Sequence, residues 1–408
     1  MKFIKKYKNF LSDMVLNMIG FGIYIFAQQI LLLPILAKIV DDNIYSSVVL
    51  YLSILNVICN VTGGELGNVR LVRDSNYKDK NLIGDFSRIL LTISPIILII
   101  VFPILIYLDY SIIGSIFLIL TILMANIRLY STSYYRLEQK YNKVIFQNIC
   151  YLVGIIISLI LFKSLNNIYI LLFIPELISV VYALKNSDLL KMKLVKTIEM
   201  VNTIKKFIQL GLVSLLTNLM NYFDKFLIYP MFGPTSVAVY YAVNSMSKIT
   251  SLITNPMSNV ILSWVSNSKS NSKNKILKTT MIANIPVILL VTILTIPFTY
   301  IALRILYNQY LSDALILIIP IAITSGFGTA STLIKSVLLK YSNTNKLLIT
   351  YIVYFVIFMI LGYNFSKIGG LQGFAIANMI SRIILWGFFV ILLIISKKED
   401  VVNEVREN

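Results

Sequence analysis

Long apolar stretches fill the chain from end to end, and short polar connections separate them. Each stretch is about 20 residues long, which is the length of helix that crosses a bilayer. The connections are too short to hold a soluble domain. The pattern therefore predicts an all-α, polytopic membrane protein. About twelve stretches meet the length criterion, at 14–37, 44–66, 88–108, 111–133, 144–163, 168–184, 207–231, 236–262, 279–302, 311–334, 346–365 and 371–395.

Polar residues inside these stretches recur at helical spacing. In 207–231 the positions i, i+3, i+4 and i+7 are polar and share one helix face: Asn218, Asn221, Tyr222 and Lys225. A charge near the bilayer centre costs about 2.5–3.5 kcal/mol on insertion scales, so it is expected to face a partner, a cavity or a pathway. Several stretches with one polar face each predict a shared water-filled interior, as in a transporter. The other polar faces carry Gln28, Asn244, Lys248, Asn255, Lys335 and Arg382.

Basic residues outnumber acidic ones, 36 against 18, and give a formal net charge of +18. They concentrate in every second connection, and the connections between carry few of them. This is the positive-inside pattern, which argues against a nucleic-acid partner. It predicts an even number of spans with both termini in the cytoplasm.

The residues that usually carry metal or nucleophilic chemistry are scarce. The chain has no histidine, and its two cysteines, Cys59 and Cys150, lack metal-ligand spacing. No phosphate-cradling GxxxxGK[ST] or GxGxxG loop occurs. We therefore expect no metal, no cofactor, no ATP hydrolysis and no enzymatic reaction.

The two halves of the chain resemble each other weakly. Pro34 and Tyr45 in the first half have the same spacing as Pro230 and Tyr241 in the second. This predicts two lobes, 1–200 and 201–408, each of about six helices and related by a parallel repeat about an axis normal to the membrane. Chance similarity between apolar segments is the alternative.

Three short motifs resemble those of a known protein family. Asp224-Lys225 is followed by Ser236-Val237-Ala238-Val239-Tyr240-Tyr241-Ala242-Val243, which is similar to a D-[KR] … G-x-Y-x-x-A pattern with Ala238 in place of the glycine. Tyr135–Lys143 and Gly369–Ala377 are the other two motifs. With the topology, they give a chain that resembles the Wzx-type polysaccharide flippases of the multidrug/oligosaccharidyl-lipid/polysaccharide (MOP) exporter superfamily.

The resemblance implies two lobes around a central cavity that works by alternating access. The implied cargo is an undecaprenyl-pyrophosphate-linked oligosaccharide, such as an O-antigen or capsule repeat unit, moved from the inner to the outer leaflet of the bacterial inner membrane. Coupling to H+ or Na+ is implied as well. The other implied partners are membrane lipids, a polysaccharide polymerase and chain-length proteins.

Such a cargo needs cations for its pyrophosphate and hydroxyl or amide partners for its sugars. The predicted pyrophosphate-binding cations are Lys248, Arg382, Lys225, Arg128 and Lys335. Lys248 and Arg382 lie near mid-membrane, whereas Arg128 and Lys335 lie close enough to the cytoplasmic ends to snorkel into the headgroups. The predicted sugar-facing residues are Asn218, Asn221, Tyr222, Asn244, Asn255 and Gln28.

The intramembrane acids are candidates for a gate or a coupling-ion site: Asp224, Glu176 and Glu65. An unpaired acid in a span is costly, so Glu176 is expected to have a cationic partner. We expect that partner to be Lys225 when the cavity faces the cytoplasm. The rival, Asp224, is adjacent to Lys225, and adjacent side chains on a helix point about 100° apart.

Two other classes fit the same composition less well. A multidrug or cation-coupled exporter of the same superfamily would favour an intramembrane acid for cationic drugs, whereas cations prevail here. A membrane-embedded glycan polymerase or transferase would usually need a long extracytoplasmic loop or a catalytic acidic motif. The predicted outer connections have only a few residues.

Overall fold

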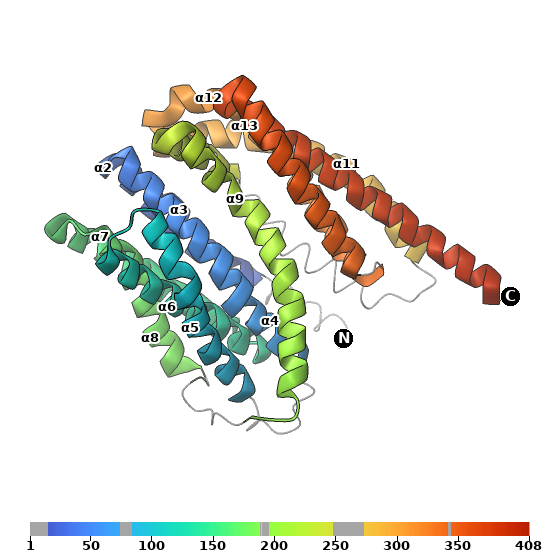
Figure 1. The fold of residues 1–408 in the computed structure, drawn as a ribbon, viewed down its shortest axis with the longest axis horizontal. Helices are drawn as coiled ribbons and strands as arrows, with labels where there is room; N and C mark the ends of the chain where they lie inside the picture. The colour runs from blue at the N-terminus through green and yellow to red at the C-terminus, as the bar shows by residue number, and fades with distance from the viewer. Residues whose placement is uncertain are drawn as a thin grey trace. The chain divides into compact units, whose positions relative to one another are not determined.

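The computed structural model describes residues 15–73, 84–187, 189, 196–247, 273–341 and 344–407. For 273–276, 339–341, 344–345 and 396–407 it describes the backbone alone. Within these ranges all regular elements are helices (Figure 1). The predicted all-α polytopic class is confirmed.

The helices follow one another with short connections. The first runs from Val15 to Ile39 and contains the π-helical η1 (Phe26–Leu32) and α2 (Leu33–Ile39). The next long helix is built from α3 (Asp42–Cys59), the π-helical η2 (Asn60–Gly64) and α4 (Glu65–Arg73). The others are α5 (Gly84–Tyr107), α6 (Ile112–Leu137), α7 (Tyr141–Leu165), α8 (Ile168–Asn186), α9 (Met200–Ser247), α11 (Lys273–Leu306), η7 (Asn308–Tyr310), α12 (Leu311–Tyr341) and α13 (Thr344–Glu407).

Ten helices in the described ranges are long and apolar enough to cross a membrane. Two of them are broken at glycines. In α9 the break is at Gly233 (φ 80°), and in α13 it is at Gly369–Gly370, where Gly370 has φ 57°. Glycine adopts positive φ without the steric cost that other residues pay. Both breaks fall between stretches that the sequence separates. Of the predicted stretch 236–262, residues 248–262 lie outside the described residues, so the number of about twelve spans stays a prediction.

Large apolar side chains cover the outer faces of several helices. Ile99 of α5 is 68% exposed and Leu290 of α11 is 58% exposed, and both have exposed apolar neighbours on the same helix. A continuous apolar surface of this kind is unfavourable in water and favourable in lipid. The burial pattern thus agrees with helices that cross a bilayer.

The chain forms two compact units. Unit 1 comprises Met1–Leu33 and Leu50–Phe223, and unit 2 comprises Pro34–Val49 and Asp224–Asn408. Unit 2 thus includes a segment from the first part of the chain. The lobes expected from the sequence, 1–200 and 201–408, divide the chain at a different point and stay a prediction.

Hydrogen bonds hold the segment 34–49 within unit 2. Asp42 accepts from the hydroxyl groups of Tyr310 (2.6 Å) and Thr235 (2.7 Å). Tyr45 is fully buried, and its ring meets that of Tyr241 edge-on with the centroids 6.5 Å apart. These two tyrosines are the pair that the weak internal repeat relates.

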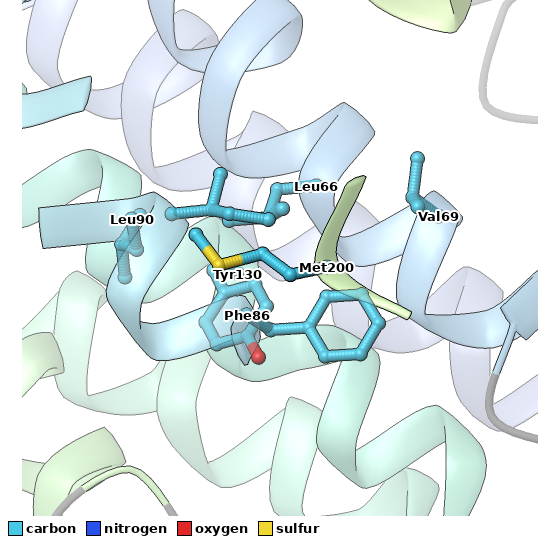
Figure 2. Packing of buried hydrophobic residues seen from close by; sticks show 7 residues of the cluster. Leu66, Val69, Phe86, Leu90, Tyr130 and Met200 are labelled. Atoms are coloured by element: carbon cyan, nitrogen blue, oxygen red, sulfur yellow. The ribbon is translucent and has the colours of Figure 1, made fainter. Parts of the chain in front are cut away.

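A hydrophobic cluster fixes the start of α9 in unit 1. It joins side chains of α4, α5, α6 and α9 (Figure 2). Met200, the first residue of α9, packs in this cluster with Tyr130, whose side chain is fully buried. The other buried members are Leu66, Val69, Phe86, Ile89 and Leu90.

Candidate functional site

A buried ion pair joins α6 to α8 in unit 1. Arg128 donates from Nε to Glu176 Oε2 (2.7 Å) and from Nη2 to Glu176 Oε1 (3.0 Å). The two side chains are 4% and 2% exposed. A two-bond guanidinium–carboxylate contact with so little solvent is strong and geometrically specific. Removing either partner would leave the other charge buried and uncompensated.

Two tyrosine rings also contact the Arg128 guanidinium. Its Cζ lies 4.5 Å from the ring centroid of Tyr24 and 5.3 Å from that of Tyr151. The two rings are tilted by 48°, with centroids 4.8 Å apart. Cations within about 6 Å of an aromatic face are attracted by its quadrupole. Tyr24 comes from the first helix and Tyr151 from α7, so four helices contribute to the surroundings of Arg128.

Close helix packing places Glu176. Helix α8 lies beside α6 and α7 (Figure 1). A Cβ atom at Gly154 of α7 would lie 2.5 Å from the Cα of Pro175, so only glycine permits this approach. Gln147 of α7 donates from Nε2 to the backbone oxygen of Arg128 (3.1 Å). Its own backbone oxygen accepts from the Ser179 hydroxyl (3.2 Å). These bonds connect the three helices around the ion pair.

The structure gives Glu176 a partner other than the expected Lys225. Both carboxylate oxygens of Glu176 bind Arg128, whereas Lys225 contacts Asp224, with Nζ and Oδ1 2.5 Å apart. Snorkelling of Arg128 to the headgroups is also excluded here, because its side chain is buried. Counting residues along ideal helices misjudged which side chains reach each other.

The Asp224–Lys225 contact corrects the helical-wheel argument. Asp224 Oδ1 accepts from the backbone N–H of Lys225 (3.0 Å), which turns the carboxylate toward the next residue. The four-carbon stem of lysine then bends back to it. Asn244 donates from Nδ2 to the other carboxylate oxygen (3.0 Å). Lys225 is fully buried and Asp224 is 3% exposed.

Two further intramembrane cations lie over tyrosine rings in unit 2. Lys335 Nζ of α12 is 5.3 Å from the ring centroid of Tyr351, and Arg382 Cζ of α13 is 5.7 Å from that of Tyr354. Both cations are half-buried. One turn before Arg382, Asn378 donates to the hydroxyl of Tyr240 (2.8 Å). Within the described chain, Lys335 forms no ion pair with a carboxylate.

The remaining predicted residues are dispersed. Asn218 accepts from Asn60 Nδ2 (3.0 Å), and Gln28 is buried within η1. Asn221 is exposed and Tyr222 is half-buried. Glu65, at the start of α4, accepts from Asn68 Nδ2 (3.3 Å). Lys248 and Asn255 lie outside the described residues.

Sequence reasoning missed a polar contact at η2. Asn126 Oδ1 of α6 accepts from the Thr62 hydroxyl (2.5 Å) and from the backbone N–H of Gly63 (2.8 Å). A Cβ atom at Gly63 would lie 2.5 Å from the Asn126 backbone oxygen. The Gly63-Gly64 pair was visible in the sequence, but its partner on α6 was not. The described residues contain no group of three His, Cys, Asp or Glu side chains that could hold a metal ion.

Comparison with known proteins identifies the fold. No protein-family model and no curated protein matches the chain. Among solved structures, it is similar to the lipid II flippase MurJ in an inward closed conformation, with a TM-score of 0.68, 18% identity, and 95% and 87% of the two chains covered. It is similar to the Vibrio cholerae MATE transporter VcmN, with a TM-score of 0.67, 11% identity, and 96% and 97% of the two chains covered. It is also similar to a MOP superfamily transporter from Pyrococcus furiosus, described as having a binding pocket of reversed polarity. Here the TM-score is 0.67, the identity is 15%, and 96% of each chain is covered. At these identities the likeness shows the fold alone: the chain has the same helical fold as these structures.

Proposed function

We propose that the chain is a Wzx-type flippase. It would move an undecaprenyl-pyrophosphate-linked oligosaccharide repeat unit from the inner to the outer leaflet of a bacterial cytoplasmic membrane by alternating access, coupled to H+ or Na+. Both termini would lie in the cytoplasm. The proposal also includes a polysaccharide polymerase and chain-length proteins as partners.

The charge balance inside the spans is the observation that carries this proposal. The two deeply placed acids are already neutralised, Glu176 by Arg128 and Asp224 by Lys225. Lys335 and Arg382 are half-buried and lie against aromatic rings. Among these six side chains four are basic and two are acidic, and a surplus of basic groups suits a pyrophosphate and disfavours a cationic drug.

The fold supports a membrane transporter of either kind, because the similar structures include both a flippase and multidrug MATE transporters. A multidrug or cation-coupled exporter is therefore the second candidate. It would need an accessible carboxylate for a cationic substrate. Glu176 is 2% exposed, and both of its oxygens are bonded to Arg128. That pairing favours the anionic cargo.

A glycan polymerase or transferase has less support. The predicted outer connections between α5 and α6 and between α7 and α8 are short turns, so neither can form an extracytoplasmic catalytic domain. A flippase and a polymerase or transferase would both bind a lipid-linked sugar. The flippase differs because it moves this molecule across the membrane without breaking a bond.

Binding of a water-dispersible short-chain polyprenyl pyrophosphate to the purified full chain tests the proposal. We expect Lys335→Ala and Arg382→Ala each to weaken binding about tenfold, the loss of about 1.4 kcal/mol that one charge-assisted contact supplies. Lys367→Ala is the matched control, because Lys367 also lies over a tyrosine ring (Tyr363, 4.3 Å) but is exposed. Tight binding of an organic cation with no binding of the pyrophosphate would favour the exporter instead.

A further inference from the structure

The surroundings of Arg128 have the composition of a cation-binding site. Tyr24 and Tyr151 present two tilted rings at 4.5 Å and 5.3 Å from the guanidinium carbon, and the Glu176 carboxylate closes a third side. Aromatic faces with a carboxylate are the groups that bind guanidinium and quaternary ammonium ligands in proteins. Here the cation belongs to the chain itself.

We infer that Tyr24, Tyr151 and Glu176 form a binding cage for a small organic monocation, and that Arg128 is its tethered occupant. The ligand class is a planar guanidinium or a compact ammonium ion. Arg128 excludes such ions as long as its side chain stays in place. It is thus a specificity-determining residue, because it fills a site where a buried carboxylate and two aromatic faces come together.

Geometry supports a cage over a simple salt bridge. The guanidinium donates Nε and Nη2 to the two oxygens of Glu176 at 2.7 Å and 3.0 Å, which fixes its plane. The two ring centroids and the guanidinium carbon then form a compact triangle, since the rings themselves are 4.8 Å apart. A rigid site of this shape does not need the tether in order to bind a guanidinium group. In the buried Asp224–Lys225 pair, the carboxylate also accepts a hydrogen bond from the Asn244 amide.

The energetics predict what happens without the tether. Arg128→Ala leaves the Glu176 charge buried beside a cavity of guanidinium shape, and an uncompensated buried charge is strongly destabilising. Cavities created by truncation bind small molecules that match the removed atoms. A free guanidinium ion should therefore enter and restore the lost contacts, and binding to the native state raises the apparent stability.

The test is thermal unfolding of the full chain, purified in detergent, in millimolar guanidinium chloride against the same concentration of sodium chloride. For Arg128→Ala we expect guanidinium to raise the melting temperature by about 2 °C or more. The wild type should not respond, because its cage is filled. The double variant Arg128→Ala/Glu176→Gln should lose the response, because its cage has no charge.

Equal unfolding of Arg128→Ala in the two salts would overturn the cage. The same conclusion follows if Arg128→Ala cannot be purified folded even with guanidinium present throughout, because the supplied cation then fails to replace the side chain. A second pair of variants tests the walls in the Arg128→Ala background. Adding Tyr24→Phe, which keeps the ring, should preserve the guanidinium response, whereas adding Tyr24→Leu should abolish it. An equal response in both would show that the rings do not form the site.

Discussion

Gly154 of α7 lies against Pro175 of α8 so closely that a Cβ atom at position 154 would be 2.5 Å from the Pro175 Cα. This approach sets the position of the next residue, Glu176, and so of its ion pair with Arg128. The contact between two backbones cannot relax by rotating a side chain. The site in unit 1 therefore depends on a glycine that has no polar group of its own.

We predict that Gly154→Ala destabilises the protein by about 1–3 kcal/mol, because overpacking forces the two helices apart. This loss would occur although alanine is the better helix former by about 1 kcal/mol. Gly22→Ala is the control, since a Cβ atom at this helical glycine meets nothing within 4 Å. Thermal unfolding in detergent should show a lower melting temperature for Gly154→Ala only. Equal behaviour of the two variants would contradict the close approach.

The buried Lys225 should act structurally, through Asp224. Lys225→Ala leaves a carboxylate that is 3% exposed without its cation, and we expect a loss of about 3–5 kcal/mol. The neutral double variant Asp224→Asn/Lys225→Met should regain much of that stability, because it removes both charges. Lys205→Ala, at an exposed position of the same helix, is the control and should be neutral. A double variant as unstable as Lys225→Ala would argue against the pair.

Asp42 should hold the segment 34–49 to the remainder of unit 2. Its two carboxylate oxygens accept from Tyr310 and Thr235, and hydrogen bonds to charged groups contribute about 1.5–3 kcal/mol. We predict that Asp42→Ala costs about 1–2 kcal/mol after allowance for partial exposure, and that Tyr310→Phe costs about half as much. Asp313→Ala is the matched control for Asp42→Ala, because Asp313 is also an acid in the first turn of a helix but is exposed. Differential scanning fluorimetry compares the three variants, and an equal effect at Asp313 would speak against the hydrogen bonds.

The helices could be predicted from sequence because hydrophobic length is a local property. The breaks at Gly233 and Gly369–Gly370 fall where the apolar pattern was interrupted, at 231/236 and 365/371. The π-helical segments η1 and η2 had no such signal. In η2 the Gly63 N–H donates to Asn126 Oδ1, a residue 63 positions away, so no local pattern indicates this contact.

The site could be predicted only in part, because pairing is a property of the tertiary structure. The sequence indicated that Glu176 needs a cation, and the structure supplies one, but from α6 and not from α9. Nothing local identifies Arg128 as that partner, since 48 positions separate the two residues. The Asp224–Lys225 contact was treated only as the rival pairing, because ideal helix geometry ignores the reach of a lysine stem.

Translocation of the cargo itself tests the central claim most directly. The full chain is reconstituted into liposomes that contain a fluorescent polyprenyl-pyrophosphoryl oligosaccharide, and chemical quenching from outside measures how fast the label exchanges between leaflets. The account predicts rapid exchange with the wild type and with Lys367→Ala. It predicts exchange about tenfold slower or more with Lys335→Ala or Arg382→Ala, because each removes one cation from the pyrophosphate path. Transport of an organic cation by the same vesicles shows that the reconstituted protein is active. If the label in these vesicles exchanges no faster than in protein-free liposomes, the account is contradicted.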